Sequence, residues 1–98
     1  MKNLFIIFVT YTKELVEIEK ILTSHREYLK TGYVSGNLLA SGPQNPRKGG
    51  IIVGQFENKE AAVNFTKQDP FYLQNAAKYE VVEFEPVLHQ DFLKNFLA

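Results

Sequence analysis

Residues 3–10 read NLFIIFVT, and this segment decides the fold of the chain. It is rich in β-branched and aromatic residues and is apolar at both odd and even positions, whereas a strand with one face in water alternates apolar and polar residues. We therefore predict a strand that is covered on both faces. The apolar run at residues 4–9 is shorter than the ~7–15 residues of an export signal, and no small-residue cleavage site follows it.

The next segment has the periodicity of an amphipathic helix. Thr12 is its predicted N-cap, and Gly32 or Gly36 is its predicted end, because glycine accepts the left-handed backbone of a helix C-terminus. Apolar residues and one histidine recur at steps of three and four, which places them on one face. These residues are Leu15, Ile18, Leu22, His25 and Leu29.

A hairpin follows the helix. Residues 38–42 (LLASG) predict a short second strand, and residues 51–56 predict a third. Between them, residues 43–50 (PQNPRKGG) carry two prolines and two glycines, a concentrated turn signal. The two strands therefore pair through this loop.

The last third of the chain predicts two helical segments, a strand and a tail. Asn58 is the expected N-cap of a helix at residues 59–68, and Asp69 before Pro70 begins a second, shorter helix. Residues 79–87 (YEVVEFEPV) predict the last strand. The tail has apolar residues at helical spacing, namely Phe92, Leu93, Phe96 and Leu97.

The element order is β-α-β-β-α-β with a tail, which is the ferredoxin-like arrangement of the α+β class, with an antiparallel sheet. We place this domain at residues 1–88 and a C-terminal helical extension at residues 89–98. Two helices cover only one face of such a sheet, yet the first strand is apolar on both faces, and Val82 and Phe84 extend that pattern on the last. A second copy of the same sheet would cover the open face, so we predict a homodimer.

Composition excludes several classes of function. Eleven basic residues balance eleven acidic ones, so no long-range field attracts nucleic acid. The chain has no cysteine, which excludes disulfides and thiolate metal sites and fits a cytoplasmic location. No run approaches the ~20 apolar residues of a membrane span. Two distant histidines make no metal site, and no phosphate-binding glycine loop occurs, so we predict neither metal nor cofactor.

Five short motifs occur along the chain in one register: residues 25–29 (HREYL), 36–43 (GNLLASGP), 49–52 (GGII), 69–71 (DPF) and 82–86 (VEFEP). In this order and spacing they resemble the YCII-like family over roughly residues 1–88. The resemblance implies a ferredoxin-like dimer that forms an α/β barrel, with a pocket near a His–Asp pair, and the matching positions are His25 and Asp69. Relatives include a dehydrochlorinase of chlorinated hydroxyquinols, and the fold is similar to muconolactone isomerases and cofactor-independent monooxygenases.

His25 and Asp69 each have a structural and a functional interpretation. On an apolar helix face, His25 is either a core histidine bonded to a backbone carbonyl or a general acid–base. Burial favours its neutral form, and an Asp partner favours its charged form. Asp69 is explained by helix capping alone, but a carboxylate has enough lone pairs to cap a helix and also orient an imidazole.

Four further residues are candidates for substrate binding. Ser41 and Gly42 end a strand near the turn, where a hydroxyl and an open backbone could meet a ligand, although ordinary turn chemistry also explains them. Arg47 is either a clamp for an anion or a solvated hairpin tip. Phe71 either lines a pocket for an aromatic ligand or belongs to the core.

Three functions follow. The first is a cofactor-independent enzyme, of lyase or isomerase type, that acts on a small organic acid with an aromatic or lactone-like structure. His25 would move the proton and Asp69 would orient it. The second is a non-catalytic small-molecule-binding or accessory homodimer that uses the same pocket. The third is an interaction module whose tail docks on a partner chain.

Overall fold

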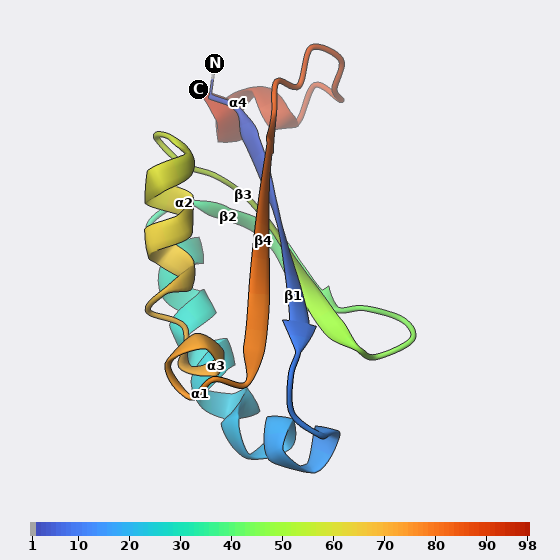
Figure 1. Cartoon of the computed structure of the whole chain (residues 1–98). Helices are drawn as coiled ribbons and strands as arrows, with labels where there is room; N and C mark the ends of the chain where they lie inside the picture. Colours follow the sequence, from blue (N-terminus) through green and yellow to red (C-terminus); the bar gives the residue numbers. More distant parts are fainter. Residues whose placement is uncertain (1) are drawn as a thin grey trace.

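The computed structural model describes residues 2–98 and shows one antiparallel sheet of strand order β2-β3-β1-β4, with helices packed on one face (Figure 1). This confirms the α+β, ferredoxin-like arrangement. The elements are β1 (Leu4–Tyr11), α1 (Leu15–Val34), β2 (Leu38–Pro43), β3 (Gly49–Gln55), α2 (Lys59–Thr66), α3 (Pro70–Leu73), β4 (Ala77–Phe84) and α4 (Leu93–Leu97).

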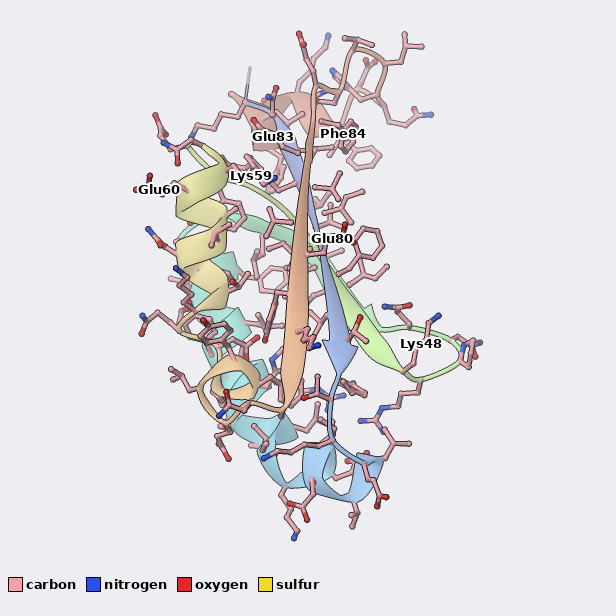
Figure 2. All side chains as sticks on the ribbon, in the orientation of Figure 1. Lys48, Lys59, Glu60, Glu80, Glu83 and Phe84 are labelled. Carbon is pink, nitrogen blue, oxygen red and sulfur yellow. The ribbon has the colours of Figure 1, made fainter. Side chains whose placement is uncertain are left out.

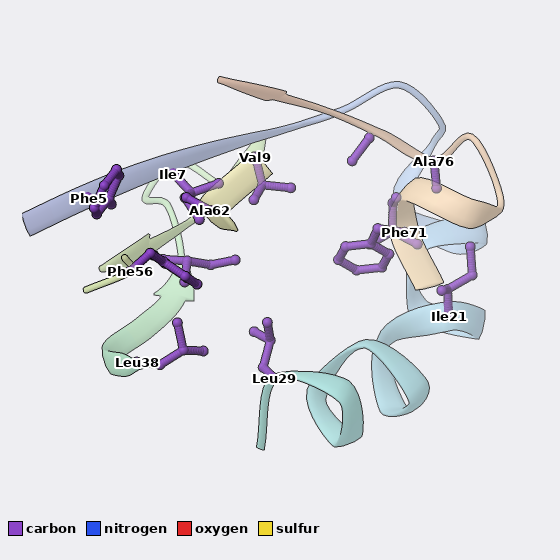
Figure 3. Close-up of a cluster of buried hydrophobic side chains, with 13 residues drawn as sticks. Phe5, Ile7, Val9, Ile21, Leu29, Leu38, Phe56, Ala62, Phe71 and Ala76 are labelled. Carbon is purple, nitrogen blue, oxygen red and sulfur yellow. The ribbon is translucent and has the colours of Figure 1, made fainter. Parts of the chain in front are cut away.

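Strand β1 is the centre of the sheet and the base of the core. It pairs antiparallel with β3 on one edge and with β4 on the other, so that Ile7 lies opposite both Ile52 and Val81. Alternate residues of β1 point toward the helices and are buried (Figure 3): Phe5, Ile7 and Val9. The apolar character of β1 is therefore explained on its inner face by contact with the helices of the same chain.

The start of α1 differs from the prediction. Glu14, not Thr12, occupies the N-cap position, and within residues 2–98 its side chain forms no capping hydrogen bond. The Thr12 hydroxyl instead donates to the carbonyl oxygen of Asn75 at 2.9 Å, and the Thr12 N–H donates to that of Ala76 at 2.9 Å. Thr12 is thus used to tie the end of β1 to the turn before β4, a partner that local sequence does not indicate.

Helix α1 ends just before Gly36, one of the two glycines predicted for this position. Gly36 has φ of 84°, the left-handed conformation that suits glycine. The Gly36 N–H donates to Tyr33 O at 3.1 Å, and the Asn37 N–H donates to Gly32 O at 2.9 Å, which together form a Schellman motif. Gly32 stays inside the helix, where an added Cβ would lie 2.6 Å from Cγ of Leu38.

Both predicted caps in the second half of the chain are confirmed. The Asn58 side chain accepts a hydrogen bond from the Ala61 N–H at 2.8 Å at the start of α2. The Asp69 side chain accepts one from the Phe71 N–H at 3.0 Å at the start of α3. Helix α2 ends at Thr66, two residues before the predicted end, and the chain turns directly into α3.

Apart from the start of β1 beside α4, the outer face of the sheet carries exposed apolar side chains in the described residues. Val82 and Phe84 of β4 are 39% and 41% exposed there, and Figure 2 shows Phe84 and Glu80 on the side of β4 that faces away from the helices. Within residues 2–98 the sheet is open at β2 and β4, so a single chain does not close a barrel. The homodimer and its barrel stay predictions.

The tail folds back onto its own chain. Helix α4 lies beside the start of β1 (Figure 1), where the Lys2 N–H donates to Leu97 O at 2.8 Å and the Leu97 side chain is fully buried. Phe92 is 73% exposed. The helical character predicted for the tail is confirmed for Leu93–Leu97, and its docking on a partner chain stays a prediction.

Gly49 provides a test of the close pairing between β1 and β3. A Cβ at Gly49 would lie 1.7 Å from the carbonyl oxygen of Val9, whereas a Cβ at Gly42 would meet nothing within 4 Å in the described chain. We expect Gly49→Ala to lower the free energy of unfolding by about 3 kcal/mol, because backbone must move. Gly42→Ala should change it by no more than about 0.5 kcal/mol. Urea unfolding of both variants measures this, and equal values would contradict the pairing.

Candidate active site: a buried His–Asp pair beside a cavity

The fold brings His25 and Asp69 together across 44 residues of sequence. His25 lies on the inner face of α1, and Asp69 lies at the start of α3. The His25 Nδ1 atom is 2.8 Å from Oδ1 and 2.9 Å from Oδ2 of Asp69. The Asp69 side chain is essentially buried and that of His25 is 12% exposed. The partner of this nitrogen is therefore a buried carboxylate and not a backbone carbonyl.

Asp69 combines both of its proposed tasks. Its Oδ1 accepts the Phe71 N–H that caps α3 and also lies against the imidazole. Because an ionised carboxylate can only accept, the hydrogen bond requires a proton on Nδ1 of His25. In the neutral imidazole, Nε2 then carries the lone pair, which makes Nε2 the atom that can take a proton.

Phe71 holds the imidazole ring in place. Its ring stacks on that of His25 with centroids 4.0 Å apart and an interplanar angle of 16°. Phe71 is itself buried, and Tyr11 contacts its ring edge-on at 5.8 Å. The imidazole is thus fixed by a hydrogen bond at one nitrogen and by a stacked ring on its face.

A cavity of about 170 Å³ lies beside the pair. Its apolar wall comes from the sheet, α1 and α3, and Figure 3 shows Val9, Leu29 and Phe71 pointing from these elements toward a common space. The predicted site residues that line it are His25, Ser41, Gly42, Arg47 and Phe71. Asp69 lies behind His25 and does not line the cavity.

Arg47 connects the hairpin loop to α1 at the cavity. Its Nη1 donates to Oε1 of Glu19, and hydrogen bonds to Glu19 and to Tyr11 raise the pKa of Arg47. Its Nε is shielded from solvent and has no partner in the described part of the chain. The guanidinium group therefore lies against α1 and is not a freely solvated hairpin tip.

Ser41 has a defined hydrogen-bond partner. Its hydroxyl lies 2.7 Å from the hydroxyl of Tyr33 on α1, so the end of β2 is also connected to this helix. The sequence did not predict the contact of Ser41 with Tyr33 or that of Arg47 with Glu19. The helical positions of Tyr33 and Glu19 were visible, but both partners come from the hairpin 8 and 28 residues further along the chain.

The influence of Asp69 on two tyrosines was also not predicted. The Tyr28 hydroxyl donates to Phe65 O at 2.7 Å, and burial, followed by the charge of Asp69, raises the pKa of Tyr28 to about 12. Burial also raises the pKa of Tyr79, and the charge of Asp69 raises it further. Tyr79 precedes Val81 by two residues, so strand alternation could have placed it on the inner face, but not beside Asp69.

Residues 2–98 also show two absences that bear on function. No helix in this range is long and apolar enough to cross a membrane. No group of three or more histidine and acidic side chains in the same range is arranged to hold a metal ion.

Comparisons with known proteins agree with the fold. The family model of the YCII-related domain matches residues 3–85. One similar solved structure is the 5-chloro-2-hydroxyhydroquinone dehydrochlorinase of Burkholderia phenoliruptrix AC1100 in complex with 2,5-dihydroxybenzoquinone, with a TM-score of 0.71 and 16% sequence identity. The alignment covers 84% of this chain and 93% of that chain. No curated protein matches the sequence. At this identity the structural likeness concerns the fold.

The raised pKa of Tyr28 predicts a loss of stability at high pH. An unfolded phenol keeps its ordinary pKa of 10.0, so the unfolded chain releases this proton before the folded chain does, at about 12. The contribution is fully present below pH ~10 and is lost as the pH rises to about 12. Urea unfolding between about pH 9 and pH 12 should show a shallower fall for Tyr28→Phe than for the wild type.

Tyr33→Phe is the matched control for this measurement, because it also removes a hydroxyl from α1. It should keep the fall seen in the wild type, since the Tyr33 hydroxyl is exposed. If Tyr28→Phe and Tyr33→Phe fall equally, the buried phenol of Tyr28 does not cause the loss.

Proposed function

The chain belongs to the YCII-related domain family, and from this premise we propose that it is a cofactor-independent enzyme that moves a proton on a small organic anion. The observation that carries the proposal is the buried His25–Asp69 hydrogen bond, which uses Nδ1 of an imidazole that also lines a cavity. A general base must be held in one tautomer and one orientation, and the carboxylate and the Phe71 ring supply both.

The proposed chemistry has two proton steps. Nε2 of His25 takes a proton from an acidic C–H or O–H group of the substrate, and the electron pair left behind moves onto a conjugated oxygen. Asp69 stabilises the imidazolium ion that forms, and the guanidinium group of Arg47 stabilises the oxyanion. The imidazolium then returns its proton to another substrate atom or to a leaving group. The first outcome is an isomerisation and the second is an elimination.

The size and lining of the cavity support a ring-sized substrate. An apolar cavity of about 150 Å³ in another protein binds benzene, and the cavity here measures about 170 Å³. Its walls are apolar at Leu22 and Ile52, whereas Arg26 and Arg47 supply positive charge. One six-membered ring with acidic substituents fits this description. The dehydrochlorinase of similar fold is named for a ring substrate and holds a ring ligand of this size class.

The alternative is a non-catalytic binding protein that uses the same cavity. It is favoured by the fact that the His25–Asp69 hydrogen bond also joins α1 to α3, which gives the pair a structural task without any reaction. Ligand binding would then stabilise the fold by mass action, with no chemical change in the ligand.

We further propose that two copies of the chain associate through the outer faces of their sheets. The outer face carries exposed apolar side chains on β4, and a hollow of about 300 Å³ lies along β2 and β3 between Ala40 and Val53. Apolar side chains in such an area are stabilised when a complementary surface removes them from water. A sheet that meets its own copy provides that surface.

Deuterium exchange tests the proton transfer. We expect the wild type to catalyse exchange of the ring hydrogens of 2,5-dihydroxybenzoquinone in D₂O. The loss of the ring-hydrogen signal, recorded by NMR, measures the exchange rate. His25→Asn should lower the exchange rate by about 10²–10⁴-fold, because its amide can still donate to Asp69 but cannot accept a proton. Ser24→Ala, whose hydroxyl donates to Ile21 O, should retain the wild-type rate. Binding of the quinone without exchange in the wild type would favour the non-catalytic alternative.

Mass measurement by sedimentation equilibrium tests the association. We expect the wild type to have the mass of two chains and Val82→Lys the mass of one, because lysine places an unpaired charge in the contact. Val34→Lys is the control, since Val34 is 90% exposed at the end of α1, and it should keep the mass of two chains. A wild type with the mass of one chain would refute the proposed dimer.

A further inference from the structure

The Asp69 carboxylate is buried with few donors around it. Its Oδ1 lies near the Phe71 N–H and the imidazole, whereas in the described part of the chain Oδ2 has only the shared imidazole nitrogen, at 2.9 Å. A carboxylate has about four lone-pair sites. An ionised carboxylate that is removed from water needs its acceptor sites filled. Asp69 therefore has unused acceptor capacity on Oδ2.

The Tyr79 hydroxyl is a hydrogen-bond donor that lacks an acceptor. Tyr79 lies on β4 opposite Val9 of β1, and its hydroxyl is buried without a partner of standard hydrogen-bond geometry in residues 2–98. Its ring lies against that of Tyr72 on α3, with ring centroids 6.1 Å apart. Burial, followed by the charge of Asp69 at the start of α3, raises the pKa of Tyr79. Since burial raises the pKa of Tyr79, the phenol keeps its proton and remains a donor. A donor without an acceptor thus lies beside an acceptor without enough donors.

We propose that Tyr79 is a positioning residue of the His25–Asp69 pair and that its hydroxyl donates to Oδ2 of Asp69. Tyr79 then acts through Asp69, because the added donor keeps the carboxylate ionised and correctly oriented toward the imidazole. The functional meaning of this contact rests on the proton transfer proposed above, whereas the contact itself can be measured without any substrate.

The sign of its effect follows from charge. When the pair releases its last proton, its net charge changes from zero to −1 inside the protein. A neutral O–H donor stabilises the −1 state more than the neutral state, wherever the proton of the neutral state resides. The other groups that face Asp69 are the Phe71 N–H from α3 and, from α1, His25 and Tyr28. The Tyr28 hydroxyl is already used by Phe65 O. Removal of the Tyr79 hydroxyl must therefore make the pair hold its proton to a higher pH.

The test is an NMR pH titration of the imidazole signals in the wild type and in Tyr79→Phe. We expect the His25 midpoint to rise by about half a pH unit or more in Tyr79→Phe, because the −1 state of the pair loses more hydrogen-bond stabilisation than the neutral state. Tyr28→Phe is the matched control, because it removes a hydroxyl near Asp69 that is bonded elsewhere. It should move the midpoint by less than about 0.2 pH unit. His89 serves as the internal reference and should stay constant.

The Asp69→Asn background separates a direct contact from a general change in the fold. There, adding Tyr79→Phe should leave the His25 midpoint unchanged, because the charge that the hydroxyl stabilises is gone. An unchanged midpoint in the single variant, or an equal rise in both backgrounds, would overturn the proposal. A midpoint shift in a protein without deuterium exchange would retain the role of Tyr79 and refute the enzyme. Deuterium exchange that depends on His25, in a protein whose His25 midpoint does not shift, would retain the enzyme and refute the role of Tyr79.

Discussion

Strand β1 must be hydrogen-bonded along both edges and buried on one face at once, and the other elements are arranged around that requirement. Its pairing with β3 and β4 places a buried apolar row against the helices. The row ends at Val9 and Tyr11, which line the cavity together with residues of α1 and of the hairpin. The site therefore lies at the end of the sheet, beyond the last side chains of the apolar core that pack against the helices. This position combines a rigid backbone with an apolar wall, which suits a small ring.

Asp69 is the second constraint, because a carboxylate that is fully removed from water must be surrounded by donors. Its donors within residues 2–98 come from two elements: the imidazole from α1 and a backbone N–H from α3. The Asp69 carboxylate, which caps α3, thus also orients the imidazole of His25. Structural and chemical tasks coincide in one side chain, so loss of the carboxylate affects both. Only measurements on the histidine itself separate the two tasks.

Arg47 and Glu19 add electrostatic control at the cavity. Glu19 neutralises part of the guanidinium charge, yet the shielded Nε remains without a partner in residues 2–98. An arginine in this state attracts an anion less strongly than a free one, but it is already oriented by Glu19. Orientation in advance reduces the entropy cost of ligand binding. The family and the fold leave the ligand open, so these side chains carry the argument about its chemistry.

The sequence by itself determined the features that depend on near neighbours. The order of the elements follows from hydrophobic periodicity, and the ends at Gly36, Asn58 and Asp69 follow from backbone conformation and capping within three residues. The pair of His25 with Asp69 was predicted, but only because the chain resembles a family in which such a pair occurs. Periodicity placed His25 on an inner face and did not identify its partner.

Only the tertiary structure decided which distant groups meet. Thr12 was expected to cap α1, but its hydroxyl bonds to Asn75, 63 residues away, because the end of β1 lies against that turn. Glu19 holds an arginine from the hairpin, and the Tyr28 hydroxyl on α1 donates to the carbonyl oxygen of Phe65 on α2. Alternation and helical spacing fix the face on which a side chain lies, since they follow from backbone geometry. The partner depends on how whole elements pack, and that is settled by the burial of the core as a unit.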